Sequence, residues 1–150
     1  MKTGEVRMVE VGHKPVVRRY AKARGRIRLK RETIKAIAEG RVEKGDVFSV
    51  AKLAAIQAVK KTWEIVPLCH LIPITGVAVD LRLGDDYVEA EVEVRATAKT
   101  GVEMEALSGV SAALLAVWDM VKALEKDERG QYPHTVIEEI RVVEKIKAHT

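Results

Sequence analysis

The sequence predicts an α+β fold in which an antiparallel sheet carries helices on one face. Two observations predict it. Several short stretches alternate apolar and polar residues, as half-buried strands do, and two of them flank the turn "GDD" at residues 84–86. A long apolar stretch at residues 106–127, "ALSGVSAALLAVWDMVKALEKD", has helical periodicity. The elements follow in the order strand, two helices, hairpin, long helix and strand, which is the order of a ferredoxin-like sandwich.

The first half of the chain is predicted to hold one strand and two helices. Residues 16–29, "VVRRYAKARGRIRL", form the strand. Residues 31–40 form a short helix, which ends at Gly40 because glycine readily adopts the left-handed conformation that stops a helix. Asp46 is a typical N-cap residue for a second helix over 47–63. The small apolar side chains of that helix predict close packing against a neighbour.

The second half is predicted to hold a hairpin, the long helix and a last strand. The hairpin strands, 77–83 and 88–94, carry Val, Leu or Ala at every second position. The long helix begins near Val102. Residues 135–147 complete the sheet, with a β-bulge expected at 142–143.

Length and composition predict a single folded domain over residues 1–150. The absence of Asn and the abundance of Lys, Arg and Glu are typical of a heat-adapted protein. The start of the chain carries charges throughout and has no signal-peptide pattern. Asp119 and Lys122 interrupt the one long apolar stretch, so we expect no membrane span.

The net charge indicates the class of partner, and the cysteine and histidine content limits the possible disulfides and metal sites. A net charge of +4 and a pI of about 9.2 favour an anionic partner, whether nucleic acid, a nucleotide or a phosphorylated metabolite. Cys69 is the only cysteine, which excludes an internal disulfide and a Cys-based zinc cluster and fits a reducing cytoplasm. Four scattered histidines offer no metal-ligand spacing, so no metal site is predicted.

The long helix carries an acid and a base three residues apart. Asp119 and Lys122 are neighbours on a helix surface, where such a pair contributes only about 0.2–0.5 kcal/mol. One interpretation is a partly exposed ion pair near the helix end. The other is general acid–base catalysis, for which a positioned lysine beside a carboxylate is suited. The same stripe of the helix, at about 100° per residue, also holds Glu105, Ser108, Ala112, Leu115 and Lys126.

The start of the long helix carries Glu103 and Glu105. Acids are favoured at a helix N-terminus by its dipole, so both have a structural explanation. Glu105 and Asp119 are fourteen residues apart, which is about 21 Å along a straight helix. One small-molecule site cannot easily touch both ends. We therefore predict a composite site at a subunit interface, where two such helices pair antiparallel across a two-fold axis.

A loop between prolines and several scattered cations complete the candidates. In residues 66–73, "VPLCHLIP", the prolines favour extended backbone. His70 is either a proton-transfer or phosphate-binding residue or a structural cap of the loop. Cys69 is expected to be a small buried side chain. Most cationic side chains in such a chain only form a solvent-exposed surface. Binding of a triphosphate would, however, need several cations at once from among Arg18, Arg19, Lys44, Lys60 and Lys61.

Two regions resemble the signatures of a known family. Residues 44–70, "KGDVFSVAKLAAIQAVKKTWEIVPLCH", and 99–127, "KTGVEMEALSGVSAALLAVWDMVKALEKD", are similar to those of the molybdenum cofactor biosynthesis protein C family, the cyclic pyranopterin monophosphate synthases. The resemblance extends over about residues 19–127. It implies a lyase that converts (8S)-3′,8-cyclo-7,8-dihydroguanosine 5′-triphosphate, the product of a radical enzyme of the same pathway, to cyclic pyranopterin monophosphate and pyrophosphate.

The resemblance also implies an assembly, cofactor use and site residues. It implies a homohexamer, a trimer of dimers with interface active sites, and a chemistry that requires no cofactor, although Mg²⁺ can accompany the triphosphate. Leu71 follows His70 where many relatives have proline, so the loop can take a different path. The catalytic residues implied are Asp119, Lys122, His70, Glu103 and Lys44, and the substrate-binding residues are Leu68, Cys69, His70, Met104, Glu105, Lys60 and Arg19.

The alternative is a basic RNA-binding module of ferredoxin-like fold. The high pI and residues 18–31, "RRYAKARGRIRLKR", favour it. Stacking on RNA needs exposed aromatic side chains, however, and the chain has one Phe, three Tyr and two Trp and no RNP-like string. A scaffold without catalytic activity is a third, weaker interpretation. We expect a nucleotide-derived substrate, with neither nucleic acid nor membrane as a partner.

Overall fold

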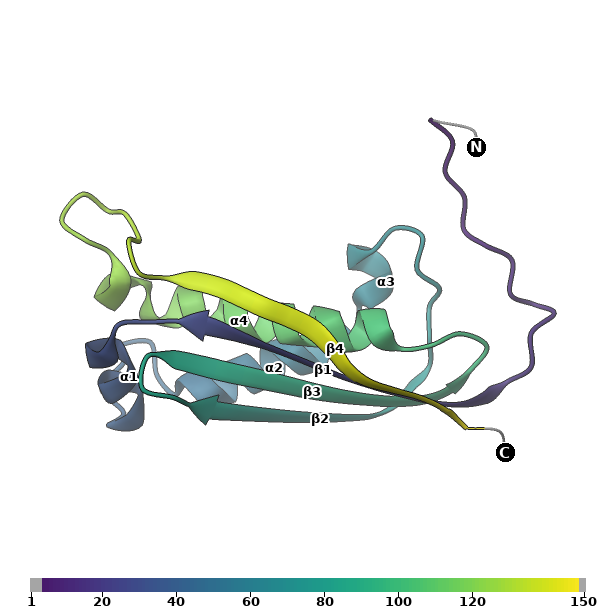
Figure 1. Ribbon diagram of the computed structural model, residues 1–150, viewed down its shortest axis with the longest axis horizontal. Coiled ribbons are helices and arrows are strands. Elements are labelled where there is room, and N and C mark those ends of the chain that lie inside the picture. The colour runs from purple at the N-terminus through teal and green to yellow at the C-terminus, as the bar shows by residue number, and fades with distance from the viewer. Residues whose placement is uncertain (1–3, 149–150) are drawn as a thin grey trace.

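Four antiparallel strands in the order β2-β3-β1-β4 form one sheet, and helices cover one of its faces (Figure 1). The structure, a computed structural model, describes residues 4–148. The predicted ferredoxin-like α+β fold is confirmed. In chain order the elements are β1 (Val17–Arg28), α1 (Arg31–Ala38), α2 (Val47–Lys60), α3 (Thr62–Ile65), β2 (Ile74–Leu83), β3 (Tyr87–Ala98), α4 (Glu103–Glu125) and β4 (Val136–Ala148).

Strand β1 is the centre of the sheet, because it pairs with β3 on one side and with β4 on the other. Its odd-numbered residues face the helices and are mostly buried, while its even-numbered residues face away. Gly25 is required on the helix side: a Cβ there would lie 2.8 Å from both Val110 and Ile140. The absence of a side chain thus lets α4 approach β1.

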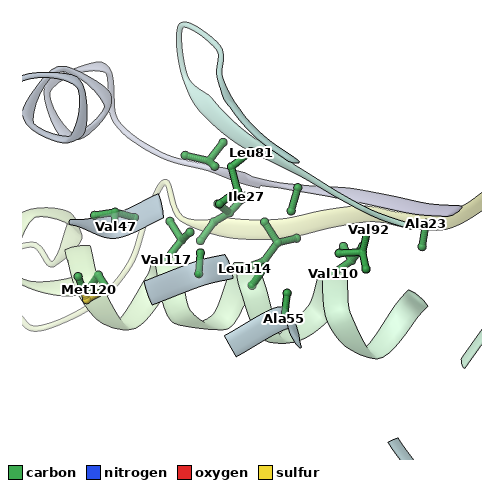
Figure 2. Packing of buried hydrophobic residues seen from close by; sticks show 14 of the residues in the cluster. Ala23, Ile27, Val47, Ala55, Leu81, Val92, Val110, Leu114, Val117 and Met120 are labelled. Carbon is green, nitrogen blue, oxygen red and sulfur yellow. The ribbon is translucent and has the colours of Figure 1, made fainter. Parts of the chain in front are cut away.

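Helix α4 packs on β1, β3 and β4 beside α2, which covers β2 on the same face of the sheet. Figure 2 shows Val110, Leu114 and Val117 on α4 beside Ile27 and Val92 of the strands. These side chains are almost fully buried, and their spacing follows the helical period. Length and composition alone would let α4 cross a membrane. Its inner face instead packs on β1, β3 and α2, as in a core helix.

Helix α2 packs closely on α4, as its small side chains predicted. A Cβ on Gly109 would lie 2.9 Å from the Val59 side chain, so glycine permits the contact. The predicted end of this helix at Trp63 is wrong, because α2 ends at Lys60 and a separate short helix, α3, follows. At this junction the Thr62 hydroxyl lies 2.8 Å from the Ala58 carbonyl oxygen and competes with regular helix bonding.

Other local predictions hold. Asp46 caps α2, and its carboxylate accepts a hydrogen bond of 2.9 Å from the Ser49 N–H. Gly40 follows α1 with a φ of +68°. The pairing of β4 with β1 skips Val143, which confirms the expected bulge, and a second irregularity lies near Glu139.

A buried carboxylate joins α1 to the end of α4. Glu125 is fully buried and accepts hydrogen bonds from the Thr33 hydroxyl, from the Thr135 hydroxyl at 2.7 Å and from the Lys30 N–H at 3.1 Å. Because the chain continues from α1 into the turn that carries Lys44, this network helps to place that turn beside α4.

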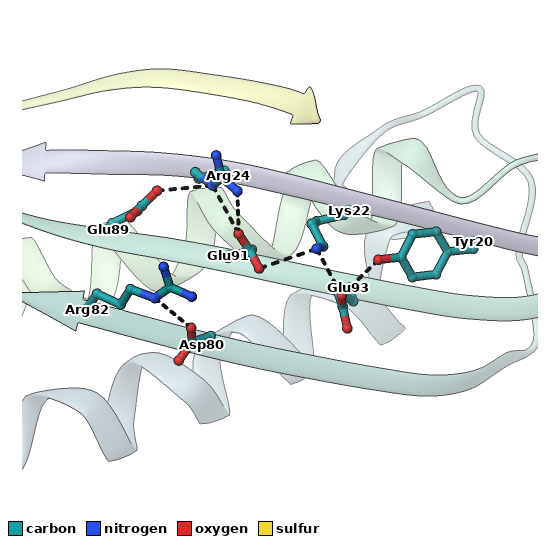
Figure 3. Close-up of polar contacts among 8 residues, drawn as sticks. All are labelled: Tyr20, Lys22, Arg24, Asp80, Arg82, Glu89, Glu91 and Glu93. Carbon is teal, nitrogen blue, oxygen red and sulfur yellow. Dashed lines mark hydrogen bonds and ion pairs between the residues drawn. The ribbon is translucent and has the colours of Figure 1, made fainter. Parts of the chain in front are cut away.

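The open face of the sheet, on the side away from the helices, is lined by ion pairs (Figure 3). Arg24 on β1 lies 2.8 Å from Glu91 on β3, and Lys22 lies 3.3 Å from Glu93. The Tyr20 hydroxyl donates to the same Glu93 at 2.8 Å. Cross-strand pairs of opposite charge of this kind stabilise neighbouring strands.

Candidate active site

Two lysines hold one carboxylate near the C-terminal end of α4. Lys44 Nζ donates to Asp119 Oδ2 at 3.0 Å and to the Asp119 backbone oxygen at 3.2 Å. Lys122 Nζ lies 3.1 Å from Asp119 Oδ1. Lys44 reaches α4 from the tight turn between α1 and α2, where Gly45 has a φ of +117°. The structure therefore brings three of the predicted catalytic residues together.

This cluster is ionised and open to solvent. The hydrogen bond from Lys44, followed by that from Lys122, lowers the pKa of Asp119 below its ordinary value. The Asp119 side chain is 58% exposed and that of Lys122 is 43% exposed. A paired carboxylate and ammonium group can exchange protons with a bound substrate, but only once the substrate or another chain covers them.

A buried acid lies at the other end of α4. Glu105 is 2% exposed, and one of its carboxylate oxygens, Oε1, has no hydrogen-bond partner within residues 4–148. Burial raises the pKa of Glu105. The Cys69 thiol lies 3.8 Å from Glu105 Oε2. Burial, followed by the Glu105 charge, raises the pKa of that thiol. This end of the helix thus holds a desolvated acid beside a protonated thiol.

Neighbours of Glu105 extend this second cluster. Glu103 lies 3.4 Å from Lys145 of β4, and its Oε1 is also buried without a partner in the described part of the chain. Met104, which follows Glu103 on α4, and Leu68, which precedes Cys69 in the chain, are exposed. Lys145 was not predicted from the sequence. It lies 42 residues after Glu103 on another element, and no local pattern indicates which acid a lysine of a strand will contact.

His70 contacts the N-terminal arm, the extended segment at residues 4–16. Its ring nitrogen Nε2 lies 2.6 Å from the Val9 carbonyl oxygen, so this nitrogen carries the proton of the hydrogen bond. Lys99 Nζ donates to the Gly12 carbonyl oxygen at 3.0 Å and fixes the same arm. A hollow of about 270 Å³ lies between the arm and the His70 loop. No pattern in the sequence indicates these arm contacts, because backbone oxygens make them.

Arg19 and Lys60 occupy different environments. Arg19 is buried and donates to the Ala98 oxygen at 3.3 Å and to the Lys99 oxygen at 3.0 Å, so it holds the segment that leads into α4. Lys60 is exposed at the end of α2. The contact of the preceding Val59 with the Gly109 position places Lys60 toward the N-terminal half of α4.

The predicted site residues therefore form two separate clusters. Lys44, Asp119 and Lys122 make up the ion-pair cluster, and the buried-acid cluster surrounds Glu105. Helix α4 is continuous from Glu103 to Glu125, so the distance of about 21 Å between the two clusters stands. Within residues 4–148, no group of three or more His, Cys, Asp and Glu side chains could hold a metal ion.

Comparison with known proteins identifies the family. Residues 8–148 match the model of the MoaC family. The chain belongs to the MoaC family. A Pyrococcus abyssi relative in this family is 64% identical, over 97% of this chain and 91% of its own length, and is named as a probable cyclic pyranopterin monophosphate synthase. A Pyrococcus furiosus protein with the same name is 66% identical, over 95% and 91%.

A third MoaC relative has a slightly different name. The protein from Methanothermobacter thermautotrophicus is 60% identical over 95% of this chain and 89% of its own length. It is named as a probable cyclic pyranopterin monophosphate synthase accessory protein. All three matches span both clusters, so the comparison covers every candidate site residue.

Proposed function

We propose that the protein is a cyclic pyranopterin monophosphate synthase. It is the lyase of molybdenum cofactor biosynthesis that converts (8S)-3′,8-cyclo-7,8-dihydroguanosine 5′-triphosphate to cyclic pyranopterin monophosphate and pyrophosphate. The observation that carries this proposal is the contact of Lys44 and Lys122 with Asp119 in a MoaC chain. It supplies an acid–base pair in a fixed geometry.

The candidate site residues fit the chemical demands of this reaction. Opening one ring and closing another requires several proton transfers, for which Lys122 serves as donor and acceptor in turn while Asp119 orients it. Loss of pyrophosphate develops negative charge, which Lys44 and Lys60 stabilise. Glu105 and His70 hold the guanine-derived ring in a drier environment. Any Mg²⁺ would enter with the triphosphate.

Replacement of Lys122 tests the proposal. Lys122→Ala is expected to lower product formation from the cyclised precursor by about 10²–10⁴-fold, because it removes the proton donor and acceptor. Its melting temperature should stay near that of the wild type. Lys126→Ala removes a lysine from the next turn of the same stripe and should keep its activity. A Lys122→Ala protein that turns over normally would contradict the proposed mechanism.

We further propose that two copies build each site, within a trimer of dimers. Within one chain, the two clusters are too far apart to contact one substrate molecule. The helix surface between them is apolar, and Leu115 on α4 is 61% exposed. Pairing of two α4 helices would cover this surface and bring opposite helix ends together. Other exposed apolar side chains on the helix side are Val50, Leu53, Trp63, Ile65, Leu68 and Leu71.

Mixed oligomers test the composite site. Asp119→Asn and Glu105→Gln chains should each be inactive alone. Co-expressed in equal amounts, they should recover about one quarter of wild-type activity, because half of the dimers are mixed and each mixed dimer has one intact site. Co-expression of two Asp119→Asn chains with different tags is the control. Recovery no greater than in this control would mean that each site lies within one chain.

The remaining expectations stay part of the proposal. We place the enzyme in a reducing cytoplasm, after the radical enzyme that makes its substrate. The RNA-binding alternative loses its main support, since Lys22, Arg24, Arg26 and Arg28 on the basic strand all contact carboxylates. Cations held in this way are not free to bind phosphates of a nucleic acid without breaking ion pairs.

A further inference from the structure

Two arginines on the open face of the sheet differ from their neighbours. Arg18 on β1 and Arg95 on β3 form no hydrogen bond or ion pair with a carboxylate within residues 4–148. The basic side chains further along β1, from Lys22 to Arg28, are all paired, and Figure 3 shows those of Lys22 and Arg24. On the open face, the cations of β1 from Lys22 to Arg28 are therefore paired with carboxylates, and Arg18 at the N-terminal end of the strand is not.

These two arginines lie close together. Arg18 pairs in register with Thr97, and Tyr20 pairs with Arg95, so Arg18 and Arg95 are diagonal neighbours on one face of the sheet. Diagonal neighbours have Cα atoms about 7–8 Å apart, which long side chains span. Two like charges at this distance repel each other, and a shared anion would relieve the repulsion.

A hollow of about 490 Å³ lies between the two side chains. Thr75, Thr97, Glu144 and Ile146 complete much of its lining. Thr75 sits where β2 shifts register, between Ile74 and Gly76, and its hydroxyl donates to the Arg95 backbone oxygen at 3.1 Å. Glu144 is the one carboxylate of the lining, so the hollow keeps a net positive charge.

The guanidinium group of Arg95 is already held in place. Its Cζ atom lies 4.6 Å from the centre of the Tyr20 ring, a cation–π contact. The nearest acid on the same strand, Glu93, is already bonded to Tyr20 and Lys22. Arg95 is thus pre-positioned without a direct ion pair, although its charge is the last of the causes that lower the pKa of Glu93. Pre-positioning lowers the entropy cost of binding an anion.

We propose that Arg18 and Arg95 form a binding site for a diphosphate group on the open face of the sheet. Each guanidinium can bind a phosphate through two parallel N–H bonds, and two such groups use four acceptor oxygens. A diphosphate group presents these oxygens on two phosphorus atoms. The site is distinct from the proposed active site, because the sheet separates it from Asp119 and Glu105.

Calorimetric titration with inorganic pyrophosphate at low salt tests this site. All proteins carry Lys44→Ala and Lys122→Ala, so that the ion-pair cluster does not contribute, and melting curves verify that each is folded. Adding Arg18→Gln and Arg95→Gln should weaken binding at least about tenfold. Adding Arg24→Gln and Arg82→Gln instead removes the same charge from two arginines of the same face that are paired with Glu91 and Asp80. This change should alter the affinity less than about twofold.

Each outcome of the titration decides the question. Arginine-dependent binding of pyrophosphate identifies the free diphosphate as ligand, and the same dependence with GTP alone identifies the phosphates of a nucleotide. Absence of binding, equal losses in the two variant pairs, or no loss with Arg18→Gln and Arg95→Gln would overturn the proposal. A changed oligomeric state on sizing of the Arg18 and Arg95 variant would also overturn it, because the arginines would then contact another copy.

Discussion

The two ends of α4 solve opposite electrostatic problems. At the C-terminal end, Asp119 is exposed, ionised and held by two lysines. At the N-terminal end, Glu105 is buried, and one of its oxygens has no partner in the described chain. Both are acids on the same helix, but burial raises the pKa of Glu105, whereas hydrogen bonds from Lys44 and Lys122 lower the pKa of Asp119. Environment, more than residue type, therefore assigns each its role.

The contrast indicates how a composite site would divide its work. The ion-pair cluster is stable in water and can hold charge and protons before a substrate arrives. The buried-acid cluster costs stability, since an unpaired buried oxygen is unfavourable, and such a cost is expected where a ligand will supply the missing partner. The following substitutions each change the environment or the charge at one end of α4.

The largest effect is expected from Lys44→Gln, which removes the stronger partner of Asp119. The pKa of Asp119 should rise toward its ordinary value, since the Lys44 hydrogen bond is the main cause of its lowering. Activity depends on the ionised carboxylate and is lost as pH falls through that pKa. The acid side of the kcat/KM profile should therefore move to higher pH. At neutral pH Asp119 stays ionised, and a loss of about 10–100-fold is expected there because the Lys44 charge no longer stabilises the departing pyrophosphate. Lys35→Gln on α1 should leave the profile unchanged, and an unshifted profile in Lys44→Gln would remove this lysine from the cluster.

Apart from its loss of activity, Glu105→Gln is expected to have a smaller effect on stability. Burial raises the pKa of Glu105 in the folded state, so the folded protein binds this proton more tightly than the unfolded chain. The contribution of Glu105 to the free energy of unfolding therefore falls as pH rises above the ordinary glutamate range, whereas glutamine does not titrate. Glu105→Gln removes the unfavourable burial of this charge, which costs about 1–3 kcal/mol. The substitution should therefore raise the melting temperature by several degrees at about pH 8 and by less at about pH 5.

Glu64→Gln, on the exposed surface of α3, is the control for this comparison and should show no pH-dependent gain. If Glu105→Gln instead lowers the melting temperature at about pH 8, a cation from a second chain pairs with Glu105 in the assembled protein. The two-copy site would then include that cation.

The smallest effect is expected at Cys69. Burial and the nearby Glu105 charge raise the pKa of the thiol, which leaves little reactive thiolate. Alkylation by iodoacetamide in the folded protein should therefore be slower than in the unfolded chain. Glu105→Gln removes the second cause and should accelerate the reaction severalfold. Equal rates in the two folded proteins would mean that Glu105 does not influence the thiol.

Local features of the fold were predictable because their signals lie within a few residues. The N-cap at Asp46 and the stop at Gly40 each depend on one side chain and its neighbours. The bulge at Val143 followed from a break in alternation within one strand. The end of α2 was mispredicted, because the Thr62 hydroxyl bonds back to the helix and the apolar pattern continues past it.

The site was only partly predictable. The spacing of Asp119 and Lys122 sets their contact, and resemblance to a family supplied Lys44. Glu105 was placed on one stripe with Asp119, but the structure buries one and exposes the other. Glu125 was missed altogether, although an acid eight residues after the buried Val117 lies close to the inner face of α4 and was a usable signal.

The sequence by itself determined the strands, the existence of the three longer helices, the pairing of acid and base on α4 and the distance between its two ends, because each follows from local backbone geometry. Only the tertiary structure decided which acid is desolvated, which lysine reaches Asp119 and which arginines of the sheet remain unpaired. These properties depend on segments that meet across long sequence separations, as when Lys44 crosses to α4, and no local pattern encodes such a meeting.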